Sequence, residues 1–246
     1  MRKMLTLFTL FIFLLFASCQ KNISDTISTP ASARVKTYTE DIRSASIGNS
    51  VITYNLSYDA SGRLTSLVSA SSPGNKFVYQ YNSNNTFTMD LYNSNALSVH
   101  EVFFLNNIPY VDSTFQYDDA GDSTTEKYIY NSSKQLIQQK EYAYSKVNGT
   151  NLLNTHTYVY DAKGNVIKDT DDFAAITYEY GDVVNSVTLG LMYFTQNKNM
   201  PVKETYTSGG ATVTVNYTYT FDSSKRLSTE KAVASNGDII IKTYTY

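Results

Sequence analysis

The sequence predicts an all-β fold, an antiparallel meander of roughly 14 to 16 strands. From residue 34 onward, apolar and aromatic residues alternate with polar ones, as in V-N-Y-T-Y-T-F at 215–221. The chain of 246 residues holds 22 Tyr and 12 Phe but no Trp. Alternation of aromatic and β-branched residues is typical of strands with one buried face. No stretch beyond residue 33 carries an apolar stripe at helical spacing over three turns, so we expect little helix.

The first 18 residues read as a secretory signal peptide. Arg2 and Lys3 precede an apolar run at 5–16, which at about a dozen residues is shorter than a membrane-spanning helix needs. Ala17 and Ser18 then lead to Cys19. This ending resembles the bacterial lipobox, in which the Cys is lipidated and becomes the mature N-terminus. The alternative is an ordinary cleaved signal with an incidental Cys, and we favour lipidation because Cys19 is the only Cys of the chain.

The lipobox has one departure from its pattern, because Phe16 stands where Leu is preferred. Residues 19–33 comprise the lipidated Cys and a Ser- and Thr-rich segment without apolar periodicity, which we interpret as a flexible tether. Residues 34–246 then form a single domain. The resemblance implies an outer-membrane lipoprotein of the bacterial cell envelope, attached to the membrane through its lipid and facing the periplasm or the cell surface.

The strands of this domain follow one another at short intervals. Clear alternation marks 52–58, 77–81, 158–160, 176–180, 215–221 and 241–246. Turn-forming residues separate them, which predicts hairpins between strands that are neighbours in the chain.

The turns between strands repeat one formula, an aromatic-x-aromatic end followed by Asp or Asn and a short polar segment. Asp59 with Gly62, and Asp161 with Gly164, give its two best copies, and Asp222 begins a looser one. Asp accepts hydrogen bonds from turn N–H groups, and Gly takes the position with φ > 0. These Asp residues are therefore interpreted as structural. In other copies Asn85, Lys134 and Lys225 replace the Gly.

The string Y-x-Y-D-x-x-G-x-L at 56–64 and 158–166 resembles the YD repeat of the Rhs family. With its loose spacing and the lipobox, the chain more closely resembles Bacteroidetes lipoprotein domains of unknown function that are described as having a porin-like all-β fold. The resemblance covers most of residues 50–246. It implies a curled or closed meander, and it assigns no catalytic residue.

The number of strands favours closure. A flat, twisted sheet of this size curls or splits, and a closed barrel leaves no exposed edge strand. We therefore predict a barrel-like meander, with a two-sheet sandwich as the alternative. A membrane-spanning barrel is disfavoured, because the strand faces are rich in Thr.

Composition excludes several classes of function. The 20 Lys and Arg nearly balance the 22 Asp and Glu, which argues against a nucleic-acid partner. One Cys permits no intrachain disulfide, and the two His, His100 and His156, both look like exposed strand positions. We find no nucleophile or phosphate-binding motif and expect no cofactor and no enzyme activity; a glycan-active enzyme stays the less favoured alternative.

The densest group of carboxylates, and the first candidate for a metal, is Asp169, Asp171 and Asp172; Asp118, Asp119 and Asp122 form a second group. Oxygen ligands at this spacing suit Ca²⁺, but an Asp-rich hairpin tip needs no metal, and we favour that interpretation.

The surplus of Tyr is the feature that indicates binding. Tyr92, Tyr110 and Tyr193 fall outside the turn formula, which makes them the candidate ligand contacts. The sequence therefore predicts a non-catalytic module that binds a glycan, a peptide or an envelope protein. The alternative is a structural scaffold of the envelope. A cleft bearing two or more aromatic residues would favour binding, and an evenly polar surface would favour the scaffold.

Overall fold

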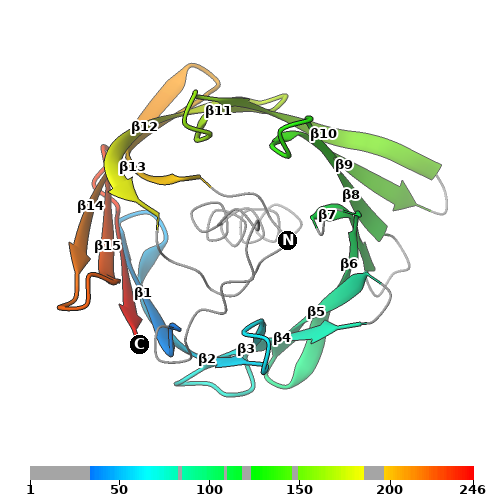
Figure 1. Ribbon diagram of the computed structural model, residues 1–246, viewed down its shortest axis with the longest axis horizontal. Helices are drawn as coiled ribbons and strands as arrows, with labels where there is room; N and C mark the ends of the chain where they lie inside the picture. The colour runs from blue at the N-terminus through cyan, green and yellow to red at the C-terminus, as the bar shows by residue number, and fades with distance from the viewer. Residues whose placement is uncertain (1–33, 83–84, 108–109, 118–122, 146–148, 186–196) are drawn as a thin grey trace.

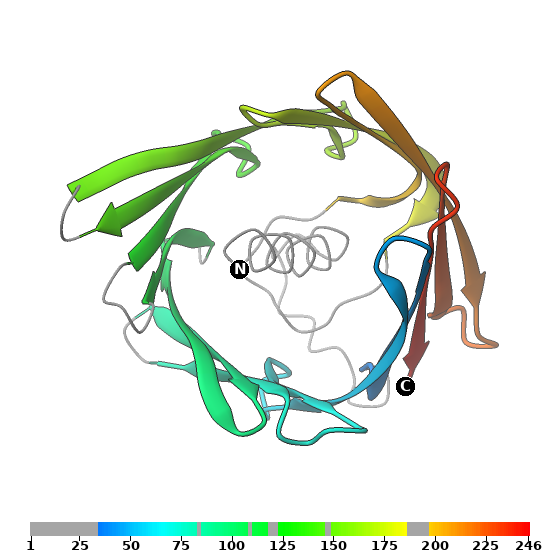
Figure 2. The same cartoon turned by 180° about the vertical axis from the view of Figure 1, so that it is seen from behind.

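The protein is one closed antiparallel barrel (Figures 1 and 2). The computed structural model describes residues 34–246 apart from 83–84, 108–109, 118–122, 146–148 and 186–196. Sixteen strands pair in chain order, and β1 closes the wall against β16. The predicted all-β meander and its closure are thus confirmed, and the sandwich alternative is wrong. In the described part of the chain, no helix has the length and hydropathy needed to cross a membrane.

The strands are β1 (Thr37–Ser44), β2 (Gly48–Tyr58), β3 (Leu64–Ser69), β4 (Lys76–Tyr81), β5 (Thr86–Asn93), β6 (Ala96–Leu105), β7 (Val111–Tyr117), β8 (Ser123–Tyr130), β9 (Leu136–Ser145), β10 (Gly149–Tyr160), β11 (Val166–Thr170), β12 (Ala174–Val184), β13 (Asn199–Ser208), β14 (Ala211–Phe221), β15 (Leu227–Ala234) and β16 (Ile239–Thr245).

Alternation along each strand assigns the two faces of the wall. In β1, Tyr38 and Glu40 are buried, whereas Thr39 between them is not. Tyr38 lies opposite Tyr244 of β16 and Tyr54 of β2, so one face continues from strand to strand. Since a single-layered barrel has no layer outside it, the buried face is the interior one.

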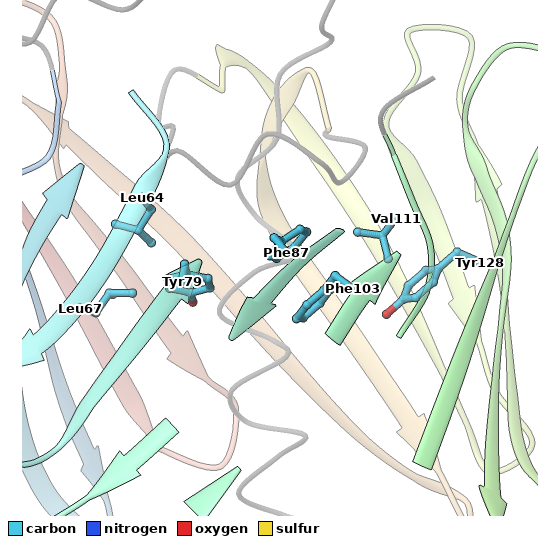
Figure 3. Close-up of a cluster of buried hydrophobic side chains, with 7 residues drawn as sticks. All are labelled: Leu64, Leu67, Tyr79, Phe87, Phe103, Val111 and Tyr128. Carbon is cyan, nitrogen blue, oxygen red and sulfur yellow. The ribbon is translucent and has the colours of Figure 1, made fainter. Parts of the chain in front are cut away.

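Two clusters of buried residues line parts of this interior. The larger cluster, from β3 to β8, is shown in Figure 3 and consists of Leu64, Leu67, Tyr79, Phe87, Phe103, Val111 and Tyr128. Its Phe87 and Phe103 rings stack with centroids 4.3 Å apart. The smaller cluster lies near the closure of the barrel and consists of Val35, Tyr38, Met200, Leu227 and Tyr244.

Five of the turns from even- to odd-numbered strands share one geometry in the residues that the structure describes. In the β2–β3 turn, the Arg63 N–H donates to Oδ1 of Asp59 over 2.9 Å, and the Gly62 N–H donates to the Asp59 carbonyl over 3.0 Å. Asp161 and Asp222 accept the equivalent bonds in the turns that follow β10 and β14. The residue that closes each turn has positive φ, at Gly62, Asn85, Lys134, Gly164 and Lys225.

A second repeated feature explains many of the tyrosines. Seven Tyr at the ends of even-numbered strands donate their hydroxyls to a backbone carbonyl at or near the start of the preceding strand. They are Tyr58, Tyr81, Tyr130, Tyr160, Tyr180, Tyr219 and Tyr246. For example, Tyr81 of β4 bonds the Leu64 carbonyl of β3 over 2.7 Å. Each bond joins two neighbouring strands at one rim of the barrel.

Candidate functional site

A groove on the outer face of β7, β8, β9 and β10 gathers aromatic side chains. We call it the outer groove; it encloses about 540 Å³ and is lined by Phe115, Tyr117, Ser123, Thr125, Lys127, Tyr142, Tyr144 and Thr150. Figure 1 shows β9 and β10 extending away from the circular wall here. The groove therefore lies where one hairpin departs from the curvature of the barrel.

Strand register builds the groove. Across β8 and β9, Thr125 lies opposite Tyr142 and Ser123 lies opposite Tyr144. Thr125 also lies opposite Phe115 of β7. Residues that face one another in a sheet share a face, so the aromatic side chains of β7 and β9 flank the small hydroxyl side chains of β8.

The groove combines flat aromatic surface with polar groups. Phe115 and Tyr117 meet edge to face with centroids 4.4 Å apart, and the Lys127 ammonium lies 5.7 Å from the centre of the Tyr142 ring. Tyr117 and Tyr144 stay 58% and 45% exposed. The arrangement can stack on a flat ligand and form hydrogen bonds at its edges.

Carboxylates gather on the opposite, interior face of the wall. We call this set the acidic arc, and it consists of Glu101 (β6), Glu126 (β8), Glu141 (β9), Asp169 (β11), Glu204 (β13), Glu230 (β15) and Glu40 (β1). The register assigns the face: Glu126 lies opposite Glu141 and opposite the buried Thr114, which in turn lies opposite Phe103 of the larger cluster. Of the interior-facing strand residues that the structure describes, only Lys242 and His156 are basic.

Several members of the acidic arc have defined partners. Lys242 Nζ lies 2.9 Å from Oε1 of Glu230. His156 Nδ1 lies 3.1 Å from Oδ1 of Asp169. The hydroxyl of Tyr217 donates to Glu204 over 2.7 Å, and that of Tyr128 donates to Glu126. These bonds satisfy single oxygens but leave the arc short of positive charge.

Burial and mutual repulsion perturb the carboxylates. Burial raises the pKa of Glu101 to about 8, and the neighbouring Glu126 adds to the rise. Burial raises the pKa of Glu126 to about 7, although the Tyr128 hydrogen bond opposes it. Burial also raises the pKa of Glu40 despite the nearby Lys242. Desolvation thus favours the protonated form in this part of the interior.

Of the predicted contact residues, Tyr92 lies on the outer face of β5, where the Lys76 ammonium is 4.9 Å from its ring centre. Tyr110 precedes β7, is 3% exposed and stacks on Tyr130 with centroids 5.4 Å apart. Tyr92 and Tyr110 thus do not share a cleft. Tyr193 lies outside the described residues, as do Cys19, the predicted signal peptide at 1–18 and the predicted tether at 19–33.

The Asp cluster spans the end of β11 and the turn that follows it. Asp169 faces the interior, where its Oδ1 lies 3.1 Å from His156 Nδ1. Asp171 accepts hydrogen bonds from the Phe173 and Ala174 N–H groups of the β11–β12 turn, and its Oδ2 lies 3.9 Å from His156 Nε2. Asp172 lies in the same turn, with its N–H directed to Asn154. Among the residues with described positions, no three His, Cys, Asp or Glu side chains are grouped to hold a metal.

The expectation of exposed histidines is wrong for His156. Its side chain is 22% exposed and faces the interior, because the alternation in T-H-T-Y places it on the same face as the buried-side Tyr158. A carboxylate partner stabilises the ring in this position. Burial opposes protonation, but the hydrogen bond that the ring donates to Asp169 raises the pKa of His156. His100 lies on the outer face and pairs with Asp90.

Sequence reasoning missed both the outer groove and the acidic arc. Tyr142 and Tyr144 are written Y-x-Y, as are the interior Tyr128 and Tyr130, so the pattern does not distinguish the faces. The carboxylates of the arc lie on seven different strands, and only the register brings them onto one belt. One sequence pattern could have indicated the arc: a carboxylate two residues from an interior Tyr in the same strand, as Glu126 is from Tyr128, must lie on the interior face as well.

No protein-family model and no curated protein matches the chain. Two crystal structures are similar to it. A porin-like protein from Bacteroides uniformis ATCC 8492 has a TM-score of 0.64 and 14% identity over 86% of this chain and 97% of its own. A porin-like protein from Bacteroides vulgatus ATCC 8482 has a TM-score of 0.59 and 12% identity over 87% of this chain and 98% of its own. These similarities show a shared porin-like barrel fold.

Proposed function

We propose that the protein is a non-catalytic binding module of the bacterial cell envelope and that it binds a glycan chain in the outer groove. The observation that carries the proposal is the groove itself, with Phe115, Tyr117, Tyr142 and Tyr144 around one cleft. A cleft with several aromatic residues is the feature expected of a binding module and not of a scaffold with an evenly polar surface.

The chemistry of the groove favours a sugar chain among the possible ligands. Exposed ring faces at Tyr117 and Tyr144 offer platforms for the apolar faces of sugar rings. Hydroxyls of Thr125 and Thr150 supply hydrogen-bond partners at the edges of such a ligand. The Lys127 ammonium favours a glycan that carries carboxylate groups over a neutral one.

The outer face of the wall supports a location in water, next to a membrane and not across it. A spanning barrel presents an apolar outward band, whereas much of this outer face is hydroxylic. On β1, β13, β14 and β16 the outward residues include Thr37, Thr39, Thr205, Thr207, Thr212, Thr214, Thr218, Thr243 and Thr245. A lipid on Cys19 would then hold the barrel at the outer membrane, facing the periplasm or the cell surface.

The test is a screen of acidic and neutral oligosaccharides against the purified protein, followed by titration of any hit. Tyr117→Ala and Tyr144→Ala should each weaken binding by about fivefold or more, because truncating a stacked aromatic contact costs at least ~1 kcal/mol. Phe104→Ala removes another exposed outer-face aromatic that does not line the groove, and it should leave affinity unchanged. Tyr92→Ala tests the site predicted from sequence.

Two results would contradict the proposal. Unchanged affinity in both groove variants would show that the ligand does not bind in the outer groove. A glycan-hydrolysing activity that is abolished by one carboxylate substitution would show that the protein is an enzyme.

A further inference from the structure

Among the residues that the structure describes, the interior of the barrel has too little positive charge for its carboxylates. Lys242 pairs with Glu230, and His156 pairs with Asp169. Glu101 has no basic side chain among the groups that influence it most, and its charged neighbour is Glu126. A buried carboxylate is costly unless a cation or several hydrogen bonds compensate it. Gln116 and Gln139 occupy the same face, so uncharged polar side chains are accommodated there and packing of the wall does not require carboxylates.

Unpartnered polar atoms lie at both ends of the acidic arc. Glu40, at one end, is 6% exposed, and its Oε1 has no hydrogen-bond partner. Tyr79, beside Glu101 at the other end, is 4% exposed, and its hydroxyl has no partner either. Buried polar atoms are nearly always hydrogen-bonded in folded proteins. Both atoms lie on the interior face of the wall.

The spacing of the carboxylates excludes one small ion as the ligand of the whole arc. Asp169, Glu204 and Glu230 lie on β11, β13 and β15, so neighbouring members of this series are two strand spacings apart, which is about 10 Å. No group of three acidic or metal-ligating side chains converges among the described residues. A single cation that contacts the whole arc would therefore have to be an extended molecule with distributed charge.

The surroundings of the arc specify the remaining chemistry. The apolar cluster that includes Leu67 and Phe87, drawn in Figure 3, lies on the same interior face as the arc. Tyrosine rings also line this face, and aromatic rings attract ammonium groups. A sixteen-stranded barrel is wider than its side chains alone fill, as in barrels of 16–18 strands that enclose a channel.

We propose that the interior of the barrel binds an extended organic polycation, a chain of ammonium groups separated by methylene segments, along the acidic arc. A free polyamine and a lysine-rich peptide both carry this chemistry. The site lies on the opposite face of the wall from the outer groove, so it does not depend on the function proposed above.

Binding of a polycation has a further signature in protons. A cation beside Glu101 and Glu126 lowers the pKa of both carboxyls, which burial holds at about 8 and about 7 in the free protein. Near neutral pH the complex therefore releases protons, on the order of one for each bound molecule. A cation held only on the outer surface would not produce this release.

The experiment is calorimetric titration of the purified protein with spermine and, separately, with tetralysine, near pH 7 in two buffers of different ionisation enthalpy. We expect binding with proton release for at least one of the two probes. The double variant Glu126→Gln, Glu141→Gln should weaken binding by about tenfold or more and reduce the proton release. Glu179→Gln removes a carboxylate from the outer face and should leave the affinity within about twofold.

Three results would overturn the proposal: no binding of either probe, equal loss of affinity in the Glu179 variant and the double variant, or stoichiometric displacement of both probes by Ca²⁺. Binding of tetralysine alone supports a peptide source, and binding of spermine alone supports a free polyamine. If the double variant does not fold, the wild-type protein alone tests the proposal: spermine must raise its melting temperature and release protons on binding, and the absence of either effect would overturn the proposal.

Discussion

Replacing Glu101 with Gln should stabilise the protein by an amount that grows as pH rises above 4.5. Glu101 is buried on β6, where Glu126 and Tyr128 of β8 and Tyr79 of β4 face it. None of these neighbours is basic. Gln keeps the size of the side chain and its ability to bond Thr114 but carries no charge.

The magnitude follows from the pKa of Glu101, which burial raises from 4.5 to about 8. The folded state then binds this proton more tightly than the unfolded state, so stability is full below pH 4.5 and falls as pH rises toward 8. Each unit of pKa difference corresponds to about 1.4 kcal/mol. At pH 7 the unfolded chain gains up to about 3 kcal/mol by releasing the proton, and Glu101→Gln avoids this loss.

The assay is urea unfolding of wild type and Glu101→Gln at several values from about pH 4 to about pH 8. The two proteins should have similar unfolding free energies at the acidic end, and the variant should be more stable by up to about 3 kcal/mol near pH 7. Glu179→Gln on the outer face is the control and should show no such pH-dependent gain. An advantage of Glu101→Gln that is independent of pH, or no advantage at all, would refute the reasoning.

Three further predictions concern the anchor and the repeated turns. Cys19→Ser should abolish labelling by a fatty-acid probe, and equal labelling of wild type and variant would exclude lipidation at Cys19. Gly62→Val should have a free energy of unfolding about 1 kcal/mol or more below that of Gly62→Asn, because φ is +83° at this position and a β-branched residue is strained there. Arg34 lies 2.7 Å from the Cβ that either variant adds, so this contact does not distinguish them, and equal urea midpoints would contradict strain as the cause. Tyr81→Phe removes the donor to the Leu64 carbonyl and should cost about 1–2 kcal/mol of unfolding free energy, whereas Tyr117→Phe, whose exposed ring is on the outer face, should cost little.

The turns could be predicted from the sequence because their geometry depends on residues that are neighbours in the chain. The geometry around Asp59 and Gly62 depends on five consecutive residues: a carboxylate reaches the N–H of Arg63, and the closing residue must accept positive φ. The same local chemistry recurs at Asp161 and Gly164. A turn whose conformation is determined by neighbouring residues can be predicted without knowing the rest of the fold.

Alternation along the strands determined the all-β class in the same way, because period two is a property of one strand. It could not assign a face to the wall. The Tyr-x-Tyr of 128–130 faces the interior and that of 142–144 faces the outer groove, although the two are written alike. Only the register of β8 against β9 decides this difference, since Glu126 lies opposite Glu141 and Thr125 lies opposite Tyr142.

The sequence by itself therefore determined the strands, their turns and their order as a meander, because hairpins join residues that are close in the chain. The tertiary structure decided the closure of β1 against β16 and which residues form the outer groove and the acidic arc. Closure pairs residues about 200 positions apart, such as Tyr38 with Tyr244, and such pairing has no local signature. The acidic arc is also a tertiary feature, because it comes from seven strands whose carboxylates share one face only through the register of the paired strands, and Glu40 joins the arc only through the closure.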